Sequence, residues 1–191
     1  MKKNKDDIVK AEDNQTKSPG WSVRMNAYAQ MLARDLGWGV GKCEILELAV
    51  VLHDIGKIGI PDEILNKPEP LTEKECKIMK EHPAVGAQIV APTIHGPMIA
   101  PIIRAHHENW DGTGYPDGLQ GEEIPEEARL IALVNAFDFM TSKQPYSETL
   151  TPNKAFSEIT KNSGSQFDPR MVEAFSRCWD RGEIQAILEG E

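Results

Sequence analysis

Four histidines and one aspartate lie in three short segments of this chain. In chain order these are the pair His53-Asp54, the single His82 and the pair His106-His107. The last pair leads into a turn-rich stretch, 108–116, with two carboxylates and two aromatic rings. Imidazole and carboxylate ligands without cysteine favour a catalytic iron, manganese or zinc ion over a structural zinc centre. We therefore expect a metal site beside a pocket of phosphate size.

Such a site would suit phosphodiester hydrolysis. That reaction needs a hydroxide at an anionic phosphorus and stabilisation of the charge that then builds up. One or two divalent ions do both, by acidifying a water and by binding phosphate oxygens. An aspartate can bind two ions at once because a carboxylate has two oxygens. We expect one or two ions, with Fe or Mn favoured and Zn as the alternative.

Helical periodicity dominates the sequence around these segments. An amphipathic helix is expected at 21–36. Segment 43–53 is apolar almost all the way round, which predicts a central helix with His53 and Asp54 at its buried C-terminal end. Further helices are expected at 72–81, 84–90, 98–107, 125–141, 152–161 and 169–180. Because no strand-like alternation occurs, we predict an all-α bundle of about seven to nine helices.

The composition is that of one globular domain. The chain has 191 residues, 40% hydrophobic and 27% charged. Residues 1–17 are polar without periodicity, so we expect a flexible lead-in followed by a single domain over 18–191. A net charge of -9 argues against nucleic-acid binding. The absence of a membrane-span or signal-peptide pattern and the three widely spaced cysteines predict a cytoplasmic protein with free thiols.

Taken together, the motifs resemble the HD-GYP family of metal-dependent phosphodiesterases. The resemblance rests on His53-Asp54-Ile55-Gly56-Lys57, on His82-Pro83 and on segment 106–116, which ends in Gly-Tyr-Pro. It extends over about residues 21–175. It implies an all-α HD-type domain in bacterial signalling, whose substrate is the second messenger cyclic di-GMP.

The resemblance also implies two ligand sets, of which one is complete here. In the family, one ion is held by the bridging aspartate and three histidines, which correspond to Asp54, His82, His106 and His107. The other ion is held by a histidine of the first helix, the His-Asp pair and a later aspartate. Here Trp21 and Asn135 occupy two of those positions, so His53 remains with a weak amide ligand from Asn135. A glutamate that builds a third site in some members is Lys17 here.

Substrate contacts implied by the family are partly kept. Lys57 matches a lysine that contacts phosphate, so Asp54 and Lys57 are the expected catalytic residues. The signature loop is matched by Gly114, Tyr115 and Pro116. Tyr115 could stack on the ligand or donate a hydrogen bond to it. In segment 143–147, Gln144 and Ser147 replace basic residues of the family, and Lys143 compensates in part.

Two functions therefore compete. The first is a metal-dependent phosphohydrolase acting on cyclic di-GMP or a related nucleotide, with weak activity because one metal site is depleted. The second is an inactive signalling module that binds a nucleotide or, in trans, a protein partner. Two ions per chain would favour the enzyme, and one or none the module. A mononuclear phosphatase of the broader HD superfamily fits less well, and both a monomer and a homodimer are compatible with the sequence.

Overall fold

The computed structural model describes residues 21–142 and 149–189, with side chains from Val23 onward. Within these ranges every regular element is a helix, which confirms the all-α prediction. The helices are α2 (Trp21–Asp35), α3 (Val40–Leu52), α4 (Asp62–Leu65), α5 (Glu73–Met79), α6 (His82–Val90), α7 (Gly96–Ala105), α8 (Glu126–Thr141), α9 (Pro152–Lys161), α10 (Pro169–Asp180) and α11 (Glu183–Glu189). Two short 3-10 turns are η1 (Ile55–Gly59) and η2 (Gly121–Glu123). None of the described helices is long and apolar enough to cross a membrane.

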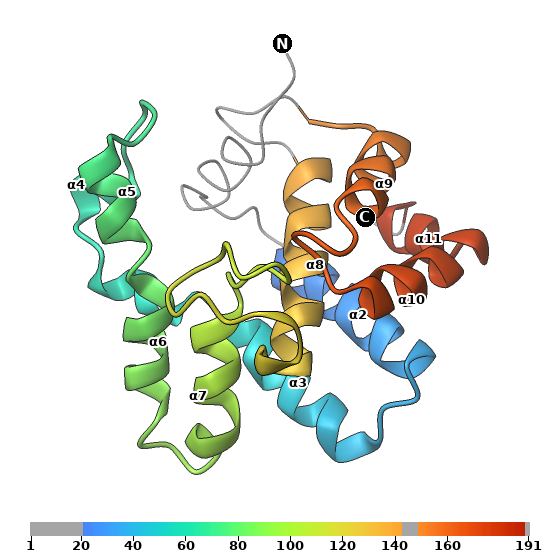
Figure 1. The fold of residues 1–191 in the computed structure, drawn as a ribbon, viewed down its shortest axis with the longest axis horizontal. Helices are drawn as coiled ribbons and strands as arrows, with labels where there is room; N and C mark the ends of the chain where they lie inside the picture. The colour runs from blue at the N-terminus through green and yellow to red at the C-terminus, as the bar shows by residue number, and fades with distance from the viewer. Residues whose placement is uncertain (1–20, 143–148, 190–191) are drawn as a thin grey trace.

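Helix α8 is the central helix of the bundle. It lies between α4 to α7 on one side and α9 to α11 on the other (Figure 1). From Ala128 to Met140 all but two of its residues are buried, because α2, α7, α9 and α10 all pack around it. Phe137, near its C-terminal end, meets Tyr28 of α2 and Phe175 of α10 edge-on, at 5.6 and 5.0 Å between ring centroids.

The prediction that the 43–53 helix is the central helix was therefore wrong. In α3 only Leu46, Ala49 and Val50 are fully buried, and Val51 is 58% exposed. The helix packs mainly on α2 and α7, so its opposite face meets solvent despite its apolar composition. At its C-terminal end His53 is buried as expected, only 1% exposed, whereas Asp54 has intermediate exposure.

Helices α4 to α7 form the side of the molecule that carries most of the histidines. The capping box predicted at Thr72 and Glu75 is present and starts α5. A small cluster of Ile60, Ile64 and Met79 packs α4 against α5. The next helix begins at His82, two residues before the predicted start at Ala84, because Pro83 fits its first turn. This register makes His82 the first residue of α6, three residues after the end of α5.

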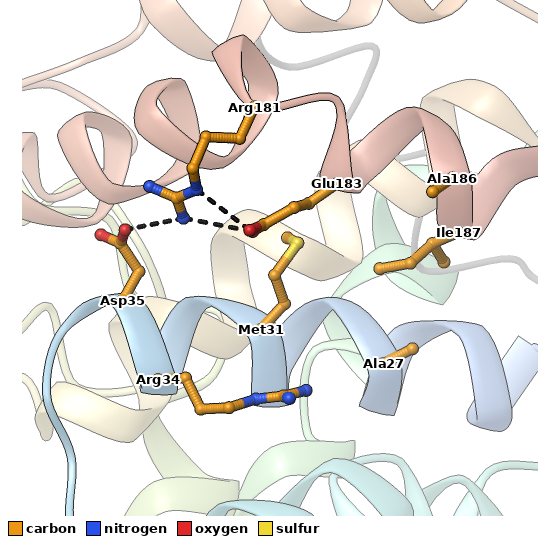
Figure 2. A pocket seen from close by; sticks show the side chains of 8 residues that line it. All are labelled: Ala27, Met31, Arg34, Asp35, Arg181, Glu183, Ala186 and Ile187. Carbon is orange, nitrogen blue, oxygen red and sulfur yellow. Dashed lines mark hydrogen bonds and ion pairs between the residues drawn. The ribbon is translucent and has the colours of Figure 1, made fainter.

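The opposite side of the molecule is closed by α10 and α11. Helix α11 was not predicted from the sequence. Arg181 and Glu183 bind each other there, and Arg181 also reaches Asp35 at the end of α2 (Figure 2). These side chains line an open hollow of about 550 Å³ between α2 and α11. Because its carboxylates are already paired with arginine, the hollow supplies no free metal ligand.

Candidate metal centre

Three buried histidines follow the ends of three helices and are oriented in the same way. His53 follows α3, His82 follows α5 and His106 follows α7. In each, Nδ1 bonds to the carbonyl oxygen three residues earlier, at 2.7, 2.8 and 2.6 Å respectively. A carbonyl oxygen only accepts, so Nδ1 carries the hydrogen and Nε2 keeps its lone pair. Helix-end carbonyls thus fix each ring with its lone pair on Nε2, the form in which an imidazole binds a metal.

Four of the predicted ligands converge on one point. Asp54, His82, His106 and His107 each offer a ligand atom, and these atoms all lie within 4.8 Å of one another. The Nε2 atoms of His82 and His106 are 3.4 Å apart. Asp54 Oδ1 lies 3.3 Å from the first and 3.9 Å from the second. Two Nε2 lone pairs cannot hydrogen-bond each other, so a cation between them and the carboxylate would relieve the contact. The donor set therefore fits a divalent ion.

Burial keeps the imidazoles in the form that binds metal. The pKa of His106 is lowered well below 6.5, first by burial and then by the neighbouring His53 and His82. Burial likewise lowers the pKa of His107, with His106 and His82 adding to the effect. Both rings are thus neutral at neutral pH, and a metal need not displace a proton to bind them.

Asp54 directs its two oxygens to different partners. Oδ1 faces the cluster, whereas Oδ2 lies 3.4 Å from His53 Nε2 and 3.2 Å from the Lys57 ammonium. The Oδ2 side is where a second ion would share the carboxylate. There Lys57 already supplies a positive charge, which opposes a second cation at short range. His53 lies beside the cluster, with its ring 5.1 Å from that of His106, but is not one of the four converging ligands.

The other predicted residues of the depleted set lie on α2 and α8. Asn135 is a buried residue of α8. One turn further on, Asp138 forms a buried ion pair with Arg24 of α2, which fixes the two helices against each other. Trp21 begins α2, but its side chain lies outside the described residues. Lys17, Lys143, Gln144 and Ser147 also lie outside the described ranges.

The Gly-Tyr-Pro loop packs directly on the cluster. The Tyr115 ring is stacked on His107, 4.9 Å between centroids and 16° between planes. The Tyr115 N–H donates to the His107 carbonyl at 3.2 Å. A Cβ on Gly114 would lie 2.3 Å from the Asn109 nitrogen, so only glycine allows this close approach. Pro116 completes the turn, and its exposure, like that of Tyr115, is intermediate.

Glu108 holds this loop and was not singled out from the sequence. It is 3% exposed, and Oε1 accepts from the N–H groups of Asp117 and Gly118 at 2.7 and 3.1 Å. The Asp117 carboxylate also pairs with Arg104 of α7 through two bonds of 2.6 and 2.7 Å. The sequence offered one signal for a role of Glu108, its position directly after two candidate ligands. That position could not predict that Glu108 binds the backbone nine and ten residues later.

In the residues that the structure describes, fold and site define an all-helical domain with a largely buried histidine–aspartate cluster suited to a divalent ion. A family model described as HD domain matches residues 7–171. The chain therefore belongs to the HD domain family, and its Gly-Tyr-Pro loop places it in the HD-GYP branch.

Curated relatives share much of the sequence. The chain is 43% identical over 166 residues to the cyclic di-GMP phosphodiesterase response regulator RpfG of Xanthomonas campestris, covering 86% of this chain and 43% of that protein. It is 42% identical over 147 residues to a cyclic di-GMP phosphodiesterase of Thermotoga maritima, covering 75% and 40%. A 3'3'-cGAMP-specific phosphodiesterase 2 of Vibrio cholerae is 35% identical over 176 residues, covering 91% and 34%. The chain thus spans less than half the length of each of these relatives.

Solved structures share the fold. The cyclic GMP-AMP-specific phosphodiesterase V-cGAP3 of V. cholerae superposes with a TM-score of 0.70 at 19% identity, over 94% of this chain and 48% of that one. Bd1817, an HD-GYP-type protein of Bdellovibrio bacteriovorus, gives 0.66 at 22% identity, over 84% and 51%. At these identities the likeness supports the fold and not the substrate.

Proposed function

We propose that this chain is a divalent-metal-dependent phosphodiesterase domain that hydrolyses cyclic di-GMP or a related cyclic dinucleotide, with slow turnover. The observation that carries this proposal is the convergence of ligand atoms from Asp54, His82, His106 and His107. The substrate class is supported by the relatives, whose names specify cyclic di-GMP or 3'3'-cGAMP.

Different residues around the cluster would bind the ion, the phosphate and the nucleobase. Asp54 and the three histidines would hold the ion, Fe or Mn by preference and Zn as an alternative. When bound, it supplies an acidified water and a ligand for phosphate oxygens. Lys57 is close enough to Asp54 to neutralise it and to present its ammonium to a phosphate oxygen. Tyr115 offers an aromatic face for a nucleobase beside His107. Outside the described residues, Lys143 is a further expected phosphate contact.

Turnover would be slow because the second ion is weakly held. Its remaining ligands are His53, the shared Asp54 and the neutral amide of Asn135, with Lys57 opposing the charge. The buried, uncharged Asn135 is also the observation that favours the alternative, an inactive module that binds a nucleotide or a protein partner.

Restoring the depleted ligands tests this proposal. The double variant Trp21→His with Asn135→Asp should raise the metal content from one ion per chain towards two, and should speed hydrolysis. Elemental analysis of reconstituted protein measures the first effect, with exposed His95→Ala as the control that should bind as much metal as the parent. If the double variant takes up no more metal than the parent, the assignment of these two positions is wrong.

We further propose a cytoplasmic location and regulation by a protein partner in trans or by homodimerisation. The three cysteines, Cys43, Cys76 and Cys178, are all free thiols, which suits a reducing compartment. Gel filtration with light scattering of the parent protein distinguishes a monomer from a homodimer.

A further inference from the structure

Lys80 is a cation near the cluster that the proposed site does not yet use. Lys57 is paired with Asp54, and Arg104 with Asp117. Lys80 instead lies over the ring of Tyr115, with Nζ 4.8 Å from the centroid. It forms no ion pair with any carboxylate in the part of the chain that the structure describes. Its positive charge is therefore not neutralised by an acidic neighbour there.

The position of Lys80 is fixed from both sides. Lys80 directly follows α5, and the carbonyl of the preceding residue, Met79, accepts the Nδ1–H of His82 at 2.8 Å. On the other side, Tyr115 is tied to His107 by stacking and by its backbone N–H. The ammonium thus lies beside an aromatic ring that packs on a candidate metal ligand. Contact with that ring occupies none of its three hydrogen-bond donors in a directed bond.

We infer that Lys80 and Tyr115 form a second phosphate-binding subsite, which takes the phosphodiester group of a cyclic dinucleotide that is not being hydrolysed. The inference rests on the proposed function. A cyclic dinucleotide carries two phosphodiester groups in one ring, so when one lies at the metal cluster the other needs a cation nearby. The chain has a net charge of -9 and as a whole repels an anionic ligand, so local cations must attract it. Lys80 therefore sets a preference for cyclic dinucleotides over substrates with a single phosphodiester.

Two substrates can distinguish a role of Lys80 in binding the second phosphodiester group from a general role in binding or catalysis. Cyclic di-GMP has both phosphodiester groups, whereas bis(p-nitrophenyl) phosphate has one. In Lys80→Met, the ratio of kcat/KM for cyclic di-GMP to kcat/KM for bis(p-nitrophenyl) phosphate should fall about tenfold, the loss of one charge-assisted hydrogen bond. Lys80→Arg should restore most of the ratio. Lys77→Met removes an exposed lysine from α5, three residues before Lys80, and should keep the parental ratio.

The outcomes separate this inference from the proposed function. An unchanged ratio in Lys80→Met, or equal losses on both substrates, would overturn the subsite. If the parent hydrolyses neither substrate, the proposed enzyme fails, and calorimetric titration with cyclic di-GMP then decides the subsite. Tenfold weaker binding by Lys80→Met than by the parent would support it. Equal affinity, or no binding by the parent, would overturn it.

Discussion

At the scale of single residues, hydrogen-bond geometry prepares the site before any ion binds. The Nδ1–H groups of His53, His82 and His106 donate to carbonyl oxygens. These bonds fix each ring as the tautomer that has its lone pair on Nε2. His82 and His106 then face each other through Nε2 at 3.4 Å. The protein thereby holds electron-rich atoms close together, and a bound cation should stabilise the folded chain.

Asp35 shows how a charged residue can stabilise the fold away from the site. Burial raises its pKa, but hydrogen bonds from Arg177 and Arg181 outweigh this and hold the pKa below 3.8. Figure 2 shows the contact with Arg181. A lowered pKa in the folded state means that the stabilisation is complete at neutral pH and is lost as the pH falls through the folded-state pKa. Both arginines are about half exposed, so solvent screens the pairs.

Asp35→Asn should therefore lower the free energy of unfolding by about 1 kcal/mol at pH 7, and by progressively less below about pH 4. Urea unfolding over this pH range measures the difference. Glu47→Gln removes an exposed carboxylate from α3 that makes no ion pair with described residues, and should change little at any pH. A loss of stability by Asp35→Asn that is the same at pH 3 and pH 7 would show that charge is not its cause.

At the scale of elements, close contact between η1 and α6 brings Asp54 to His82. Gly56 of η1 lies against the first turns of α6, where an added Cβ would meet the His82 carbonyl oxygen at 1.9 Å and the Gly86 nitrogen at 2.4 Å. Both contacts are with backbone, which cannot move aside as a flexible side chain could. The ligand spacing therefore depends on glycine at this crossing.

Gly56→Ala should lower the free energy of unfolding by about 1–3 kcal/mol and weaken metal binding, because η1 must move away from α6. Thermal unfolding and metal titration by calorimetry measure the two effects. Gly41→Ala is the matched control, since a Cβ there meets nothing within 4 Å and should stabilise α3 by up to about 1 kcal/mol. A Gly56→Ala protein with parental stability and metal affinity would contradict this account of the crossing.

Local signals predicted several elements closely. Thr72 and Glu75 gave the start of α5, and the Pro-led helices α9 and α10 end at Lys161 and Asp180, as expected. Such signals are carried by residues a few positions apart, so they can be read from the chain directly. Burial is different, because it depends on neighbours. The apolar run of α3 did not reveal that α8 would take the central position.

The candidate site likewise combines residues that the sequence predicted with contacts that it could not predict. The types and motif positions of Asp54, His82, His106 and His107 identified them as candidate ligands, and the fold brings these four together. The sequence did not indicate that Lys57 would pair with Asp54 Oδ2. It also gave no sign of the contact between Lys80 and Tyr115, which joins a helix end to a loop 35 residues later. These interactions depend on tertiary packing.

At the scale of the whole molecule, the histidine cluster lies on one side of α8. Helices α5 to α7 supply or precede three of its ligands, while α8, at the centre, carries Asn135 and is fixed to α2 by Arg24 and Asp138. A complete second metal site would have to span this junction. The junction itself is intact, so the proposed slow turnover would stem from the side chains at Trp21 and Asn135 and not from a distorted fold.

The most direct test is hydrolysis of cyclic di-GMP by protein purified without oxygen and reconstituted with Fe(II) or Mn(II), with products separated by chromatography. The account predicts slow, metal-dependent formation of linear product, reduced at least a hundredfold in His107→Ala, which loses one of the four converging ligands. Folded parent protein that gives no product with any metal, or a His107→Ala variant as active as the parent, would contradict it.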